Sequence, residues 1–174
     1  MFDFLKRERK PNPDASRLLA SILVVYPTIQ SVTYDSKEDI LELSFALNGK
    51  FSPSDFEYFL KYVGESVETL HYLEGLSGAS IELNVDGIYG TCFLNVRRDM
   101  ATLTIRELSL LTEMAANYFG DKLIEDFDSA VPDEDFLMEQ EDYLEQCLNN
   151  MRQFRVEGKL VGVREQERVV VYAR

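Results

Sequence analysis

The stretch that decides the fold runs from Ala79 to Phe127 and reads ASIELNVDGIYGTCFLNVRRDMATLTIRELSLLTEMAANYFGDKLIEDF. Its first residues alternate between apolar and polar side chains, which is typical of a half-buried β-strand. Asp86-Gly87 follows, and this dipeptide accepts the positive φ angles of a tight hairpin turn. A return strand is expected over about residues 88–97. The start of this stretch therefore predicts a β-hairpin.

A helix is expected directly after the hairpin. Thr104-Ile105-Arg106-Glu107 has the spelling of a capping box, in which the first and last side chains satisfy backbone N–H groups at the helix start. Apolar residues then recur at helical spacing along one side: Ile105, Leu108, Leu111, Ala115 and Phe119. The sequence thus predicts a hairpin that feeds into a long amphipathic helix.

The residues before this unit show the same order of elements. A helix opens at Asn12-Pro13 and ends at Pro27, because proline suits the first helical turn but cannot continue a helix. Two strands follow, at about residues 29–34 and 41–47, and form a hairpin. A second helix begins after Ser52, where Phe51 and Phe56 have the spacing of a hydrophobic staple. Gly75 is its expected end.

These elements predict an α+β fold with one antiparallel β-sheet built from two hairpins and covered by helices. The order is α-ββ-α-ββ-α, followed by a C-terminal helix and a further hairpin. We expect an N-terminal arm over residues 1–11, a main domain over 12–128, and a C-terminal helix–hairpin unit over 129–174. That last unit is too short to hold a core alone, so it must pack on the main domain or on a dimer mate.

The C-terminal helix carries two adjacent apolar rows. The first row consists of Leu137, Leu144, Leu148 and Met151, and the second of Phe136, Tyr143 and Cys147. One row is enough for docking within the chain. The second row predicts a further covered surface, and therefore a homodimer whose interface includes this unit.

Composition narrows the classes of function. The chain has 174 residues with a net charge of −13, which disfavours a nucleic-acid partner. Two widely spaced cysteines fit a reducing compartment, and neither a secretory leader nor a membrane span is predicted, so a cytoplasmic location is expected. Met1–Lys10 is apolar and then basic. It is expected to dock locally, with peripheral contact to an anionic membrane as the alternative.

The sequence contains no recognised catalytic motif, and no cofactor is expected. His71 is the only histidine and is placed at the edge of the core near the end of the second helix. Cys92 is expected to be a core residue. From Glu113 to Glu145 there are twelve acidic residues and one basic residue. The candidate ligands for Ca²⁺ or Mg²⁺ in this segment are Asp126, Asp128, Asp133 and Asp135. The EF-hand spacing fails, so we expect a solvated acidic face.

The prediction for function is a non-enzymatic cytoplasmic interaction protein, an adaptor or chaperone-like module whose acidic surface meets a basic protein partner. In element order and acidity alone, without a residue motif, the chain resembles small acidic secretion-type chaperones. The residues predicted to take part in interaction are Phe136, Tyr143, Leu144, Arg152 and Arg155. One alternative is a carboxylate-based, metal-dependent enzyme or binder. Another is a ribosome- or RNA-associated factor that uses the basic C-terminal hairpin.

Overall fold

The fold was analysed in a computed structural model that describes residues 13–77, 79–88, 90–125, 134–153, 158–166 and 168–174. The elements, in chain order, are α1 (Pro13–Val25), β1 (Ser31–Asp35), β2 (Ile40–Asn48), α2 (Pro53–Leu73), β3 (Ile81–Ile88), β4 (Thr91–Asp99), α3 (Ile105–Phe119), the short 3-10 helix η1 (Gly120–Lys122), α4 (Glu134–Gln153), β5 (Lys159–Glu165) and β6 (Arg168–Ala173). Asn12, the expected cap of α1, lies outside the described residues.

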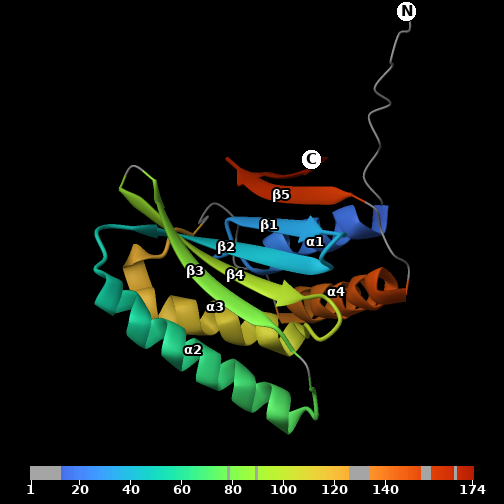
Figure 1. The fold of residues 1–174 in the computed structure, drawn as a ribbon. Coiled ribbons are helices and arrows are strands. Elements are labelled where there is room, and N and C mark those ends of the chain that lie inside the picture. The colour runs from blue at the N-terminus through green and yellow to red at the C-terminus, as the bar shows by residue number, and fades with distance from the viewer. Residues whose placement is uncertain (1–12, 78, 89, 126–133, 154–157, 167) are drawn as a thin grey trace, which may run out of the picture.

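The strands form one antiparallel sheet in the order β3-β4-β2-β1-β5-β6 over the described residues. The predicted α+β class and the single sheet shared by the two inner hairpins are confirmed. Figure 1 shows α2 and α3 running beside each other beneath the sheet, with α4 next to them. The helices therefore cover one face of the sheet, and no described helix covers the other, which we call the open face (Figure 1).

The C-terminal hairpin belongs to this same sheet. β5 pairs with β1 along its length, from Ser31–Val163 to Asp35–Lys159, and α4 packs against α1. Gly162 lies directly under α1, where an added Cβ would meet Leu23 at 3.1 Å and Leu19 at 3.3 Å. The strands β5 and β6 thus extend the sheet of the main domain within the same chain.

The turn of the second hairpin differs from the sequence prediction. Asp86 and Gly87 are paired inside the ladder with Phe93 and Cys92, and the described turn residue is Gly90, with φ +81°. This longer register pairs Leu83 with Val96 and Val85 with Leu94, so the apolar faces of the two strands match. The free energy gained from this apolar pairing outweighs the local preference of Asp-Gly for a tight turn, and it therefore sets the register.

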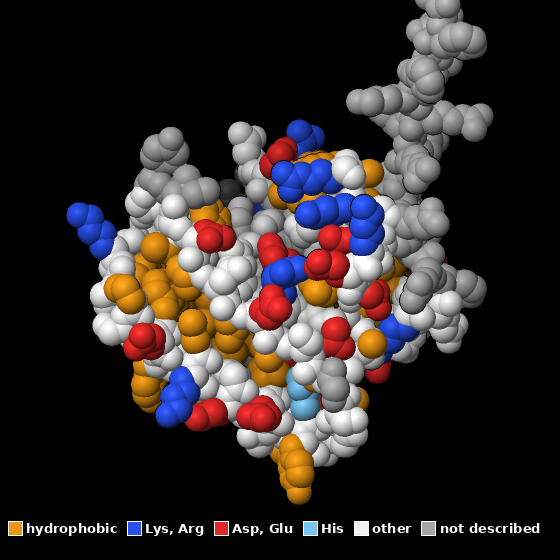
Figure 2. Space-filling view, in the orientation of Figure 1, with side chains coloured by type: hydrophobic (Ala, Val, Ile, Leu, Met, Phe, Trp, Pro, Cys, Tyr) orange, Lys and Arg blue, Asp and Glu red, His pale blue; other side chains and the backbone are white. Residues whose placement is uncertain are grey.

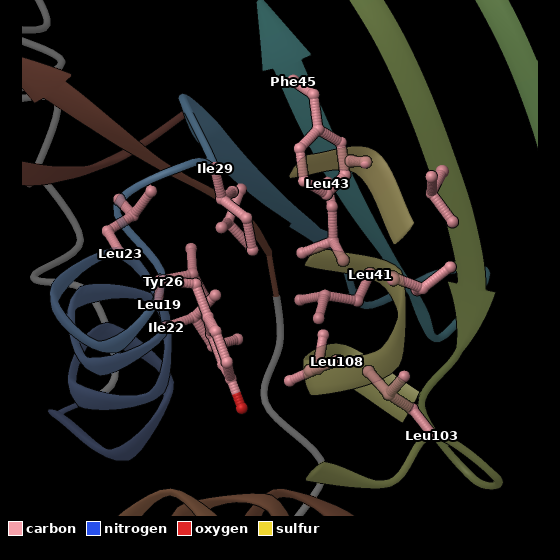
Figure 3. Packing of buried hydrophobic residues seen from close by; sticks show 14 of the residues in the cluster. Leu19, Ile22, Leu23, Tyr26, Ile29, Leu41, Leu43, Phe45, Leu103 and Leu108 are labelled. Carbon is pink, nitrogen blue, oxygen red and sulfur yellow. The ribbon is translucent and has the colours of Figure 1, made fainter. Parts of the chain in front are cut away.

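The core lies between the sheet and the helices. Figure 3 shows side chains of α1 and β2 pointing into one shared space, beside Leu103 and Leu108. Leu19, Leu43 and Leu108 are each no more than 1% exposed. Packing around the second helix follows the sequence prediction, because the rings of Phe51 and Phe56 lie 5.2 Å apart, as a hydrophobic staple requires.

A buried ionic cluster joins α2, β4 and α3. The Arg98 guanidinium is 1% exposed and donates two hydrogen bonds to the Glu107 carboxylate, from Nε at 2.6 Å and from Nη2 at 2.8 Å. Nη2 also lies 3.3 Å from Nε2 of His71. The same Nε2 lies 3.4 Å from Oε2 of Glu107, so the imidazole is next to both members of the ion pair. His71 is therefore buried at the edge of the core, as expected from the sequence.

This cluster also corrects the predicted capping box. The Thr104 hydroxyl accepts a hydrogen bond from the Glu107 backbone N–H at 3.2 Å, so the first half of the motif is present. The Glu107 carboxylate, however, turns inward to Arg98. Leaving a fully buried guanidinium without a charged partner costs more free energy than leaving the helix start without a second side-chain cap.

Asp99 lies at the more exposed side of the same cluster and contacts Arg98 directly. Burial by itself would raise the pKa of this carboxyl. The Thr102 hydroxyl and the Ser80 backbone N–H both donate to it, and together with Arg98 they hold the pKa of Asp99 below its usual range. Asp99 is thus favoured as a carboxylate in the folded protein.

Candidate protein-binding groove

A groove of about 640 Å³ lies between α2, α3 and α4. A second depression of about 390 Å³ adjoins it along α2 and shares Leu70 and Leu110 with it. We call the two depressions together the helical groove. Its volume is in the range of ordinary ligand pockets, but it is open along its length and is bounded by three helix faces. That shape suits an elongated occupant.

Helical periodicity brings the lining residues together. On α3, Ile105, Ser109 and Glu113 are four residues apart, and on α4 the same spacing separates Glu141 from Glu145. Residues four apart lie on one face of a helix, so each helix presents a continuous strip to the groove. The buried residues of α3, such as Leu108 and Leu111, belong to its other side.

The floor of the helical groove is apolar. Leu70, Ile105 and Leu110 line it and are half-buried, which leaves part of each side chain open to solvent. Tyr62 and Leu73 of α2 continue the floor and are 50% and 75% exposed. Large apolar side chains at such exposure mark a surface that gains free energy when a partner covers it.

The walls of the helical groove are acidic. Six carboxylates from three helices line it: Glu65, Glu74, Glu113, Glu141, Asp142 and Glu145. One guanidinium, that of Arg106, is among the lining residues and lies 3.8 Å from Glu74. Its side chain is 82% exposed, so this pair is well solvated and contributes little to stability. The strip as a whole attracts positive charge.

The floor is tied to the end of α1 by a polar contact. The Tyr26 hydroxyl and the Ser109 hydroxyl lie 3.0 Å apart, within hydrogen-bond distance. Burial raises the pKa of Tyr26; the hydrogen bond to Ser109 opposes this shift, and the nearby Glu141 carboxylate adds to it. The phenol therefore stays neutral under the acidic wall and holds α3 against α1.

The predicted interaction residues differ in how exposed they are and in what they contact. Phe136 and Tyr143 are 42% and 37% exposed. Leu144 is fully buried in the core between α4 and the rest of the domain. Arg152 donates to the backbone carbonyls of the loop before α3, those of Met100 (2.9 Å) and Leu103. Arg155 lies outside the described residues.

The candidate metal ligands are not brought together within the described part of the chain. Asp126, Asp128 and Asp133 lie outside it, and Asp135 sits in the first turn of α4. No group of three or more His, Cys, Asp or Glu side chains that suits a metal ion is found among the residues that are described. The described residues therefore contain no metal site that would support the metal-dependent alternative.

The two arginines of β4, Arg97 and Arg98, are engaged by acidic side chains within the chain. Arg97 lies on the open face of the sheet among three carboxylates, those of Glu38 at 2.7 Å, Glu42 at 3.4 Å and Glu82 at 3.4 Å. Arg98 is the buried partner of Glu107. Both are neutralised by neighbouring acids, which lowers their attraction for phosphate.

Sequence reasoning identified the acidic segment but not the helical groove. Glu113 and the carboxylates on α4 were visible as an acidic run, whereas Glu65 and Glu74 are distant in sequence and meet it only in three dimensions. The available signals were the four-residue spacing of Glu141 and Glu145 on α4 and that of Ile105, Ser109 and Glu113 on α3. No helix within the described ranges is long and apolar enough to cross a membrane.

Comparisons with protein-family models, with curated proteins and with solved structures found no match to this chain.

Proposed function

We propose that this protein is a non-enzymatic adaptor or chaperone-like module whose helical groove binds a basic, amphipathic segment of a partner protein. The observation that carries the proposal is the combination of an apolar floor with acidic walls. Leu70, Ile105 and Leu110 offer apolar area, and carboxylates from three helices flank it. A helix with apolar residues along one side and Lys or Arg beside them complements both features.

Charge complementarity gives such a site its selectivity. The acidic walls speed the encounter with a basic segment and disfavour acidic competitors, while the apolar floor supplies the contact area that slows release. We also propose that the protein acts in the cytoplasm, where its two unbridged cysteines, Cys92 and Cys147, remain reduced. The binding of a basic segment is expected to weaken as salt screens the exposed carboxylates.

A synthetic peptide tests the proposal. The probe is a fluorescein-labelled amphipathic peptide of Leu and Lys, about 14 residues long, because shorter isolated helices are marginal in water. Fluorescence anisotropy measures its binding to the wild-type protein and to the double variant Glu141→Gln/Glu145→Gln. Exposed ion pairs contribute about 0.2–1 kcal/mol each, so the double variant is expected to bind about 2- to 30-fold more weakly.

The matched control is Glu57→Gln/Glu68→Gln, which removes the same charge from exposed positions of α2 outside the helical groove. It is expected to leave the affinity nearly unchanged. Equal weakening by both double variants would show that the peptide responds only to net charge, and the proposed site would then be rejected. A scrambled Leu/Lys peptide that binds as tightly as the amphipathic one would reject the role of the apolar floor.

A further inference from the structure

The strand β3 forms an edge of the sheet and pairs with β4 alone among the described strands. The pairing pattern shows which of its backbone groups face outward. The Met100 N–H donates to the Asp39 carbonyl at 3.0 Å and the Asp99 N–H donates to the Ser80 carbonyl at 3.4 Å. Even-numbered residues of β4 therefore bond to β2, and odd-numbered ones bond to β3. It follows that Ile81, Leu83 and Val85 direct their N–H and C=O groups away from the sheet.

The side chains of these same residues form an apolar row on the helix side of the sheet. Ile81, Leu83 and Val85 pack against the core but are only partly buried, as is Leu60 of α2. Figure 2 shows hydrophobic side chains uncovered in a band between β3 and α2. A strand added to β3 would place every second side chain on this band, because residues opposite each other in a sheet share a face.

The opposite face of β3 carries acidic residues. Glu82 and Asp86 alternate with the apolar row and are exposed, and Asn95 of β4 donates to Asp86 at 2.9 Å. Glu82 also lies 3.4 Å from Arg97, with its side chain 65% exposed. Opposite charges directly across a strand pair stabilise it, so this row favours Lys or Arg on an added strand.

The acidic row also bears on whether β3 can pair with the β3 strand of a second copy of the chain. If two β3 strands paired antiparallel about Asn84, Glu82 of each chain would face Asp86 of the other. Like charges directly opposite destabilise a strand pair, and charged residues on edge strands are a known protection against self-association. In that register, like charges disfavour pairing with a second copy, whereas a segment carrying Lys or Arg at these positions complements the acidic row.

We propose that β3 is a second interaction surface, which binds an extended partner segment of alternating apolar and basic residues by strand addition. The backbone groups of Ile81, Leu83 and Val85 bind the partner's main chain, and the band between β3 and α2 buries its apolar row. This surface lies on the β3 side of α2, whereas Tyr62, Ser66 and Leu73 face the helical groove. The proposal is independent of the function proposed for that groove.

The test uses a blocked heptapeptide of alternating Lys and Val as the probe, with anisotropy for affinity and amide hydrogen exchange for location. Binding is expected to slow exchange at the amides of Leu83 and Val85. Val85→Pro removes one outward N–H without touching the ladder to β4, and proline is tolerated at such edge positions. The loss of one ladder hydrogen bond is expected to weaken binding roughly 2- to 12-fold.

A second variant and two controls keep the test decisive. Asp86→Lys, at an exposed position, is expected to weaken binding about 2- to 5-fold. The groove variant Glu141→Gln/Glu145→Gln is expected to change nothing, which separates this proposal from the first. A peptide methylated at alternate backbone nitrogens, so that it cannot donate to β3, is expected not to bind. Equal binding of that peptide, or full affinity of a folded Val85→Pro protein, overturns the proposal. Protection of the same amides in the protein alone at high concentration identifies a second copy as the occupant and overturns it too.

Discussion

The ion pair between Arg98 and Glu107 offers a sharp test of what holds α3 on the sheet. Glu107→Leu leaves a guanidinium that is 1% exposed without its main partner, and Arg98→Met leaves a carboxylate that is 0% exposed facing only His71, at 3.4 Å. Removing one member of a buried pair costs about 3–5 kcal/mol, because the remaining charge stays buried and uncompensated. Each single variant is therefore expected to lose about 6–20 °C in melting temperature.

The double variant Arg98→Met/Glu107→Leu is expected to behave differently. It removes both charges together, and replacing a buried pair by apolar side chains is often neutral. The Ser80 carbonyl and Asp99 lose the bonds they now accept from Arg98, which leaves a net cost of about 0–2 kcal/mol. The double variant should consequently be more stable than either single variant.

Urea unfolding at neutral pH, followed by far-ultraviolet circular dichroism, measures all four proteins of this cycle. The reasoning is refuted if the two single losses simply add within about 0.5 kcal/mol in the double variant, because independent sites behave in that way. It is also refuted if either single variant loses less than about 1 kcal/mol, a value typical of unremarkable substitutions.

Three further predictions concern packing, acid stability and assembly. Gly162→Val is expected to destabilise the fold by about 1–3 kcal/mol, because its Cβ would press on Leu23. Gly64→Ala, with open space around it in α2, is expected to stabilise the fold by about 0.4–1 kcal/mol. Urea unfolding measures both changes. Because folding lowers the pKa of Asp99, its carboxylate stabilises the folded protein at pH values above its unfolded pKa of about 3.9. This stabilisation is lost as the pH falls through the folded pKa. In Asp99→Asn, the free energy of unfolding measured with urea should therefore fall less steeply with acid than in the wild type. Light scattering should find a homodimer at high micromolar concentration, and Tyr143→Glu, at a position 37% exposed on α4, should dissociate it, while a monomeric wild type contradicts that prediction.

Local signals in the sequence were enough for most of the elements. Alternation predicted the strands of both inner hairpins, and the Phe51–Phe56 staple and Gly75 marked the start and end of α2. These signals are readable because each depends on neighbours within one or two turns of the chain. The net charge and the acidic run were likewise visible without a structure.

Other features depended on contacts between distant residues. The turn moved from Asp86-Gly87 to Gly90 because pairing Val85 with Leu94 outweighs a local turn preference. Glu107 reads as a capping residue in the sequence, but the buried Arg98 draws its carboxylate inward. Neither the hairpin register nor the orientation of Glu107 can be predicted from residue spacing alone, since in both cases the partner lies on another strand or helix.

The sequence by itself determined the fold class, the order of elements and the acidic character of this protein, because these follow from periodicity and composition. Only the tertiary structure decided where the acidic side chains gather. Carboxylates of α2, α3 and α4 line one apolar floor, and β3 is an edge of the sheet among the described strands. Both surfaces arise from the way separate elements pack, and packing depends on complementary shape across the whole core, which no single stretch of sequence encodes.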